Sequence, residues 1–132
     1  MLIDELVTLV AQHDTVIVQE DVPLADSAKL IADYNIGALP VVDEEDNIKG
    51  ILSERDIVRA VSQHGSAFFE KTVKEAMTSS VITCSVNDNV EEIHALLGEK
   101  RIRHIPVAEE GKLVMLLSIR DFQRAYTMTL AH

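Results

Sequence analysis

Apolar residues recur along this chain with two spacings, one typical of helices and one typical of strands. Helical spacing predicts helices at residues 2–10, 24–35, 53–63 and 88–100, and from residue 118 onward. Short apolar or alternating runs predict strands at residues 15–19, 38–42, 48–52, 81–85, 104–108 and 112–117. Helices that alternate with strands, with a hairpin in each half, predict an α/β fold with mixed sheets.

The second half of the chain repeats the pattern of the first. Pro106 lies 66 residues after Pro40, and Ser118 lies 65 residues after Ser53, because the acidic turn at residues 43–47 is shortened by one residue in the second hairpin. Each half alone is too small to bury its apolar strands. We therefore expect the halves to pack on one another about a pseudo-twofold axis, so that any site at that axis occurs twice.

Five segments follow from these patterns. They are an N-terminal amphipathic helix (1–14), a first repeat (15–63), a connector (64–80), a second repeat (81–126) and a C-terminal tail (127–132). Within the connector, residues 64–67 have the composition of a loop and residues 73–77 are predicted to form one helical turn. The apolar face of the N-terminal helix must be covered, either by the core of the repeats or by a second subunit.

Composition and charge restrict the class of protein. Of 132 residues, 47% are hydrophobic, which is enough for the core of one compact domain, and the formal net charge of −10 disfavours nucleic acid as a partner. No apolar run approaches the roughly 18 to 20 residues that a membrane span needs, and the N-terminus lacks the basic start of a signal peptide. Cys84 is the only cysteine and is predicted to be a buried strand residue, which fits a reducing cytoplasm.

A Ser-x-x-Asp sequence stands in both halves where a strand runs into a helix. The two copies are Ser53-Glu54-Arg55-Asp56 and Ser118-Ile119-Arg120-Asp121. One such copy alone is close to a capping box, which satisfies orphan backbone donors. The helix dipole disfavours an arginine in the first turn, yet each copy has one. An anion bound at the free backbone N–H groups would interact favourably with both the dipole and the arginine. The carboxylate beside that anion would suit the vicinal hydroxyls of a ribose; alternatively, both arginines point to solvent.

The two halves differ in charge where the chain enters the middle strand. The second half has Lys100-Arg101-Ile102-Arg103-His104, and the first half has the uncharged Asn35-Ile36-Gly37-Ala38. A favourable interaction with the helix dipole explains Lys100 and Arg101. That interaction does not reach Arg103 and His104, which lie past the end of the helix. They are either ligand-binding groups or side chains that are exposed or satisfied within the core.

Enzyme and metal motifs are not found in the sequence. Neither Ser53 nor Ser118 lies in a Gly-x-Ser-x-Gly elbow, there is no P-loop, and Cys84 lacks an evident base. The five histidines lack zinc-ligand spacing, and the acidic run 43–46 lacks the EF-hand pattern, so it is interpreted as a solvated turn.

Each half resembles a cystathionine β-synthase (CBS) domain. The resemblance lies in residues 36–43 with 50–56, and in residues 101–107 with 116–121. A pair of such domains is a Bateman module, and the likeness extends from residue 15 to residue 126. It implies two pseudo-twofold-related β-α-β-β-α repeats packed as one module, as in stand-alone CBS-domain proteins.

The resemblance also implies a ligand. Such pairs enclose two clefts that bind adenosine-containing molecules: AMP, ADP, ATP, NAD(H) or S-adenosylmethionine. The aspartates would hold ribose hydroxyls, and the serines would contact ribose or phosphate. Each cleft would join the first strands of one copy to the Ser-x-x-Asp of the other, so that Arg103 and His104 serve Asp56, with Thr83 near the adenine. The full set of implied ligand-binding residues is Ala38, Ser53, Arg55, Asp56, Thr83, Arg103, His104, Pro106, Ser118, Arg120 and Asp121.

We expect the two clefts to be unequal. Met115 stands where the first half has Gly50, so a bulky side chain occupies a place where the backbone could approach a ligand. The cleft of Asp121 also faces Gly37 and Ala38 instead of the basic pair. The phosphate-rich cleft is therefore predicted to be that of Asp56.

These features predict a non-catalytic sensor module that transmits the binding of an adenine nucleotide to a regulated enzyme or transporter on another chain. The family likeness implies a homodimer with the helices that start at Ser53 and Ser118 at the contact. The alternative is a dimerisation or interaction scaffold whose clefts have lost ligand. Met115 favours that alternative for one cleft, and Arg103 with His104 disfavours it for the other.

Overall fold

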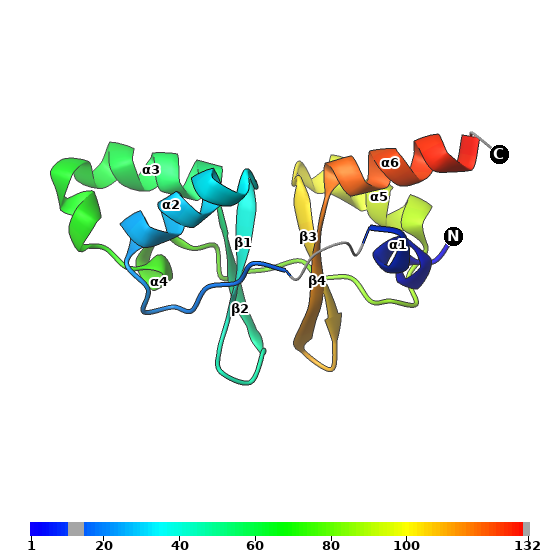
Figure 1. Cartoon of the computed structure of the whole chain (residues 1–132), viewed down its shortest axis with the longest axis horizontal. Coiled ribbons are helices and arrows are strands. Elements are labelled where there is room, and N and C mark those ends of the chain that lie inside the picture. Colours follow the sequence, from blue (N-terminus) through cyan, green and yellow to red (C-terminus); the bar gives the residue numbers. More distant parts are fainter. Residues whose placement is uncertain (11–14, 131–132) are drawn as a thin grey trace. The chain divides into compact units, whose positions relative to one another are not determined.

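The computed structural model describes residues 1–10 and 15–130 and confirms the α/β class (Figure 1). In chain order the elements are α1 (Ile3–Val10), α2 (Leu24–Tyr34), β1 (Ala38–Val42), β2 (Ile48–Ser53), α3 (Glu54–His64), the 3-10 helix η1 (Gly65–Glu70), α4 (Val73–Ala76), α5 (Val90–Lys100), β3 (His104–Glu109), β4 (Lys112–Ser118) and α6 (Ile119–Leu130). No helix in this part of the chain is both long and apolar enough to span a membrane.

The chain forms two units. Val16–Val81 make up the repeat-1 unit, and the described residues of 1–15 and 82–132 make up the repeat-2 unit. Each has a core of its own, because its apolar strands and helix faces pack within the unit. The repeat-1 core contains Val18, Leu24, Ile31, Leu39, Val41, Leu52, Ala60, Phe68 and Val73, and the repeat-2 core contains Ile3, Leu6, Cys84, Val90, Ile93, Leu97, Ile105, Val107, Leu117, Phe122 and Ala125.

An antiparallel hairpin lies at the centre of each unit. β1 pairs with β2, β3 pairs with β4, and the register shifts at Val41/Val42 in the first and at Val107/Ala108 in the second. The two irregularities are 66 residues apart, the offset of the sequence repeat. The duplicated pattern is thus reproduced in the backbone hydrogen bonding.

The two predicted outer strands are shorter than expected. Residues 15–19 contribute only a parallel bridge from Val18 to Val41, and residues 81–85 only one from Cys84 to Val107. The prediction of strands there was wrong, because a turn follows at once: the Val22 N–H donates to the Gln19 carbonyl. A parallel bridge beside an antiparallel hairpin is nevertheless the mixed pairing that the sequence predicts.

Two local predictions also need correction. The helix expected to open with a capping box at Asp88 opens one residue later, because Asn89 Oδ1 accepts from the N–H groups of Glu91 and Glu92, at 2.9 and 3.2 Å. Asp88 Oδ2 instead accepts from Ser85 N–H at 2.7 Å. The connector expected at 64–67 is the end of α3 and the start of η1, which buries Phe68 in the repeat-1 core.

The N-terminal helix α1 covers the core of the repeat-2 unit. Ile3 and Leu6 are fully buried there. Helix α4 takes the same place in the repeat-1 unit, where Val73 is buried. The matching backbone bonds are Ile3 N to Asp88 O (2.8 Å) and Asp4 N to Val86 O (2.9 Å) in one unit, and Val73 N to Val22 O (2.9 Å) and Lys74 N to Glu20 O (3.0 Å) in the other. The helix that precedes each repeat in the chain therefore packs on the other repeat.

Candidate functional site

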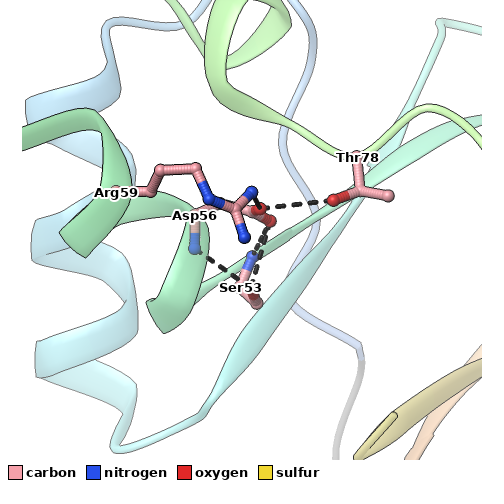
Figure 2. Close-up of polar contacts among 4 residues, drawn as sticks. All are labelled: Ser53, Asp56, Arg59 and Thr78. Carbon is pink, nitrogen blue, oxygen red and sulfur yellow. Dashed lines mark hydrogen bonds and ion pairs between the residues drawn. The ribbon is translucent and has the colours of Figure 1, made fainter. Parts of the chain in front are cut away.

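The Ser53–Asp56 element closes a capping box at the start of α3 (Figure 2). Ser53 has an extended backbone, and its Oγ accepts from the Asp56 N–H at 3.2 Å. Asp56 Oδ2 in turn accepts from Ser53 N–H at 2.9 Å and from Ser53 Oγ at 3.0 Å. The capping interpretation of this sequence is confirmed, since two orphan backbone donors are satisfied by the two side chains.

The second carboxylate oxygen of Asp56 is also occupied. Oδ1 accepts from Thr78 Oγ1 at 3.2 Å and from Arg59 Nη1 at 3.4 Å (Figure 2). The side chain of Asp56 is only 4% exposed, whereas that of Arg59 is 54% exposed. A buried carboxylate must be hydrogen-bonded to avoid a large desolvation cost, and here the protein itself supplies four donors. Neither Thr78 nor Arg59 was predicted. The i,i+3 spacing of Arg59 from Asp56 is a signal that could have identified Arg59, whereas nothing in the sequence points to Thr78.

Thr78 is held beside Asp56 by backbone pairing. Its N–H donates to the Ile51 carbonyl and its carbonyl accepts from the Ile51 N–H, both at 2.9 Å. This approach requires Gly50, because a Cβ there would lie 2.7 Å from the Thr78 carbonyl oxygen and 2.8 Å from Met77 Sδ. Gly50 thus admits the protein's own backbone, a reason that the sequence did not reveal.

The second copy of the element is built more loosely. Asp121 Oδ2 accepts from Ser118 N–H at 2.8 Å and from Ser118 Oγ at 3.2 Å, and the side chain is half-buried. Within residues 1–10 and 15–130, no donor contacts Asp121 Oδ1 and no ion pair joins it to Arg124, the counterpart of Arg59. Met115 packs against the repeat-2 core and is partly buried.

Both first-turn arginines are exposed. Arg55 and Arg120 form neither a hydrogen bond nor an ion pair with any residue that the structure describes. They are therefore available to an anion at the helix N-terminus, and the alternative that they point to solvent describes the unliganded protein equally well.

The remaining predicted site residues lie in separate units. Ala38 is buried and stands opposite Ser53 in the β1–β2 register, and His104 stands opposite Ser118 in the β3–β4 register. In the repeat-2 unit Arg103 and Thr83 are exposed. His104 is half-buried and Pro106 is buried, both in β3. A joint action of Arg103 and His104 with Asp56 stays a prediction.

An acidic hollow of about 420 Å³ lies in the repeat-1 unit, between residues 19–21 and 42–45. Asp43 builds its rim by accepting from Glu45 N–H and from both the backbone and side-chain nitrogens of Asn47. The side-chain hydrogen bond from Asn47 is the main reason that the pKa of Asp43 is lowered. In the described part of the chain, no group of three or more His, Cys, Asp or Glu has the arrangement of a metal site.

Cys84 is a structural residue in this environment. It is buried, and burial, with a contribution from the Asp88 charge, raises the pKa of its thiol from 9.0 to about 12. A thiol held neutral in this way is a poor nucleophile at neutral pH.

Sequence comparison finds relatives for nearly the whole chain. It is 32% identical over 120 residues to an uncharacterised 17.7 kDa protein of Acidianus ambivalens, covering 90% of this chain and 71% of that protein. It is 34% identical over 111 residues to inosine-5′-monophosphate dehydrogenase of Bifidobacterium longum, covering 83% of this chain but only 20% of that enzyme.

Solved structures share the fold. A CBS-domain containing protein from Agrobacterium tumefaciens has a TM-score of 0.87 at 32% identity, covering 96% of this chain and 99% of that one. The CBS domain pair of protein MJ0100, solved in complex with 5′-methylthioadenosine and S-adenosyl-L-methionine, has a TM-score of 0.80 at 25% identity, covering 96% and 99%. The CBS domain model matches residues 6–63 and again residues 73–127. The chain therefore belongs to the CBS-domain family and contains a pair of CBS domains.

Proposed function

We propose that this CBS pair is a non-catalytic regulatory module that binds an adenosine-containing ligand through its Ser-x-x-Asp elements. The observation that carries the proposal is the same arrangement at two helix starts: a serine and an aspartate joined by hydrogen bonds, with an exposed arginine between them. The MJ0100 pair, which was solved with 5′-methylthioadenosine and S-adenosyl-L-methionine, supports a ligand of this class.

The chemistry of an adenine nucleotide suits these groups. A ribose offers two neighbouring hydroxyl donors, which a carboxylate such as that of Asp56 or Asp121 accepts. Phosphate oxygens are favoured at a helix N-terminus by the free N–H groups and the dipole. Arg55 or Arg120 adds a guanidinium that can donate two parallel hydrogen bonds to a phosphate. Thr83, Arg103 and His104 are proposed as further contacts, for adenine and phosphate.

Regulation in this proposal acts on another chain. A ligand shifts a conformational equilibrium only through a difference in its affinity for the two states, and a partner enzyme or transporter would bind one state better. The proposal includes a homodimer, which is supported by apolar side chains exposed on α3 and α6. These are Val58, Val61 and Tyr126.

Thermal denaturation with AMP, ADP, ATP, NADH and S-adenosylmethionine tests the proposal. A ligand that binds only the folded state raises the melting temperature, by an amount that grows with its concentration. Calorimetric titration of Asp56→Ala and Asp121→Ala then assigns the sites, and we expect unequal losses of affinity. Equal losses in the two variants would contradict the prediction of unequal sites.

One observation favours a second candidate, an interaction scaffold without ligand at Asp56. Its carboxylate already has four protein donors, so no acceptor position is vacant in the structure. Under this candidate none of the five ligands shifts the melting temperature, and calorimetry shows no heat of binding.

A further inference from the structure

We propose that Thr78 is a latch on Asp56: its hydroxyl holds an acceptor position that a ribose needs, so a ligand must displace it to bind there. This inference rests on the proposed function, in which the Ser-x-x-Asp aspartates accept ribose hydroxyls. It adds a residue that sets the affinity of one site and not of the other.

The number of hydrogen bonds that Asp56 can accept decides whether a ribose can bind without displacing a protein donor. An ionised carboxylate has about four lone-pair positions. The donors present are Ser53 N–H and Oγ on Oδ2, and Thr78 Oγ1 and Arg59 Nη1 on Oδ1. The vicinal hydroxyls of a ribose need two positions, so two of these four donors have to leave.

The donors differ in how readily they leave. The bond from Ser53 N–H is half of the capping box, and its loss would undo the start of α3. The other half, from Asp56 N–H to Ser53 Oγ, holds that hydroxyl 3.0 Å from Oδ2. Arg59 is the weakest, because its contact is 3.4 Å long and its side chain is 54% exposed, so it can turn into solvent at little cost. Thr78 is the remaining donor, and it has to yield for a second hydroxyl to be accepted.

Thr78 is fixed by more than its hydroxyl. The backbone bonds to Ile51 keep it beside β2, and Gly50 makes room for it. Four residues later the chain enters the repeat-2 unit at Ile82. Displacing the hydroxyl therefore removes one of the three hydrogen bonds by which Thr78 holds this linking segment to the repeat-1 unit.

The second copy has no such latch among the described residues. Asp121 Oδ1 has no donor there, although Oδ2 keeps both bonds from Ser118. The ribose contribution to affinity is accordingly smaller at Asp56 than at Asp121. For phosphate the predicted order is the opposite, because Arg103 and His104 are assigned to the site of Asp56.

Thr78→Val removes the hydroxyl and little else. Valine has the same branched shape, favours extended backbone and keeps both backbone bonds to Ile51. The titration uses AMP and 5′-methylthioadenosine in an Asp121→Asn background, so that Asp56 is the reporting site. We expect Thr78→Val to raise the affinity for both ligands by about three- to tenfold, the worth of one hydrogen bond that no longer has to be broken.

Matched variants make the result specific. Ser79→Ala removes a neighbouring exposed hydroxyl that has no hydrogen bond to the described residues, and Thr78→Ser keeps the latch; both should bind like the parent, with normal melting curves confirming folding. In an Asp56→Asn background, Thr78→Val should no longer change affinity, because the latch acts through the carboxylate.

The outcomes separate the two proposals. If the parent binds AMP and Thr78→Val binds it equally or more weakly, the latch is overturned while the proposed function stands; weaker binding would mean that the hydroxyl contacts the ligand itself. A gain in affinity that persists with Asp56→Asn also overturns it. If neither the wild-type protein nor Thr78→Val binds AMP, 5′-methylthioadenosine or any other ligand of the thermal test, the proposed function fails, and the latch with it.

Discussion

Replacing Gly50 by alanine should destabilise the protein, although the change adds a single methyl group. The added Cβ would lie 2.7 Å from the Thr78 carbonyl oxygen and 2.8 Å from Met77 Sδ, distances that real Cβ atoms essentially never show. The Met77 side chain can adjust, but the backbone oxygen can move only if the segment at Thr78 shifts away from β2.

The cost follows from what that shift breaks. Overpacking of this kind costs about 1–3 kcal/mol. The two bonds between Ile51 and Thr78, and the bond from Thr78 to the carboxylate of Asp56, are the interactions at stake. Alanine also restricts the unfolded chain, which returns about 0.5–1 kcal/mol. We expect a net loss of about 1–2 kcal/mol in the free energy of unfolding.

Equilibrium denaturation in urea measures this loss, and Gly98→Ala is the matched control. Gly98 lies in α5 with nothing within 4 Å of the position of a Cβ, so alanine there should stabilise by about 0.5–1 kcal/mol. The two substitutions should therefore have opposite signs. A Gly50→Ala protein as stable as the wild type would refute the reasoning. It would leave the approach of a ligand as the better explanation for the glycine.

Two more predictions follow from the cores. Leu6→Ala should lower the free energy of unfolding by about 2–5 kcal/mol and lower hydrogen-exchange protection in β3–β4 before β1–β2, because Leu6 is buried in the repeat-2 core. Leu9→Ala, at an exposed position of α1, should lower it by at most about 0.5 kcal/mol. Equal effects of the two substitutions would contradict the packing of α1. Cys84 has a folded pKa of about 12, above its ordinary 9.0, so its contribution to stability is complete below pH 9 and is lost as pH rises toward 12. Cys84→Val should weaken this alkaline loss of stability, measured by denaturation between pH 8 and 11. A native thiol that reacts quickly with a thiol reagent at pH 8 would refute the burial.

Short-range patterns predicted much of this fold. Both hairpins, the capping box of Ser53 with Asp56 and the burial of Cys84 follow from the order of apolar and polar residues, because neighbours in sequence decide them. The outer strands were overestimated, because an alternating run of β-branched residues does not show how many of its residues pair; in residues 15–19 only Val18 forms a bridge. The start of α5 was misplaced by one residue because Asp88 and Asn89 are both good caps.

Long-range contacts were not predictable in the same way. Thr78 reaches Asp56 across 22 residues, and no spacing connects a connector threonine to a helix cap. The contrast of Gly50 with Met115 was visible as a difference between copies, but its cause depends on which segment crosses β2. That information lies in the tertiary fold alone.

Because α1 and α4 each pack on the repeat that they do not precede in the chain, the protein cannot be divided into two stable halves at the boundary between its sequence repeats. A fragment ending before Val73 would lack α4 and would carry α1 without the core that buries Ile3 and Leu6; the complementary fragment would expose that core. Each half of the chain thus supplies the helix that covers the core of the other half. The chain starts in the repeat-2 unit, passes through the repeat-1 unit and returns. Removing either CBS domain together with the helix that precedes it would therefore expose the core of the other.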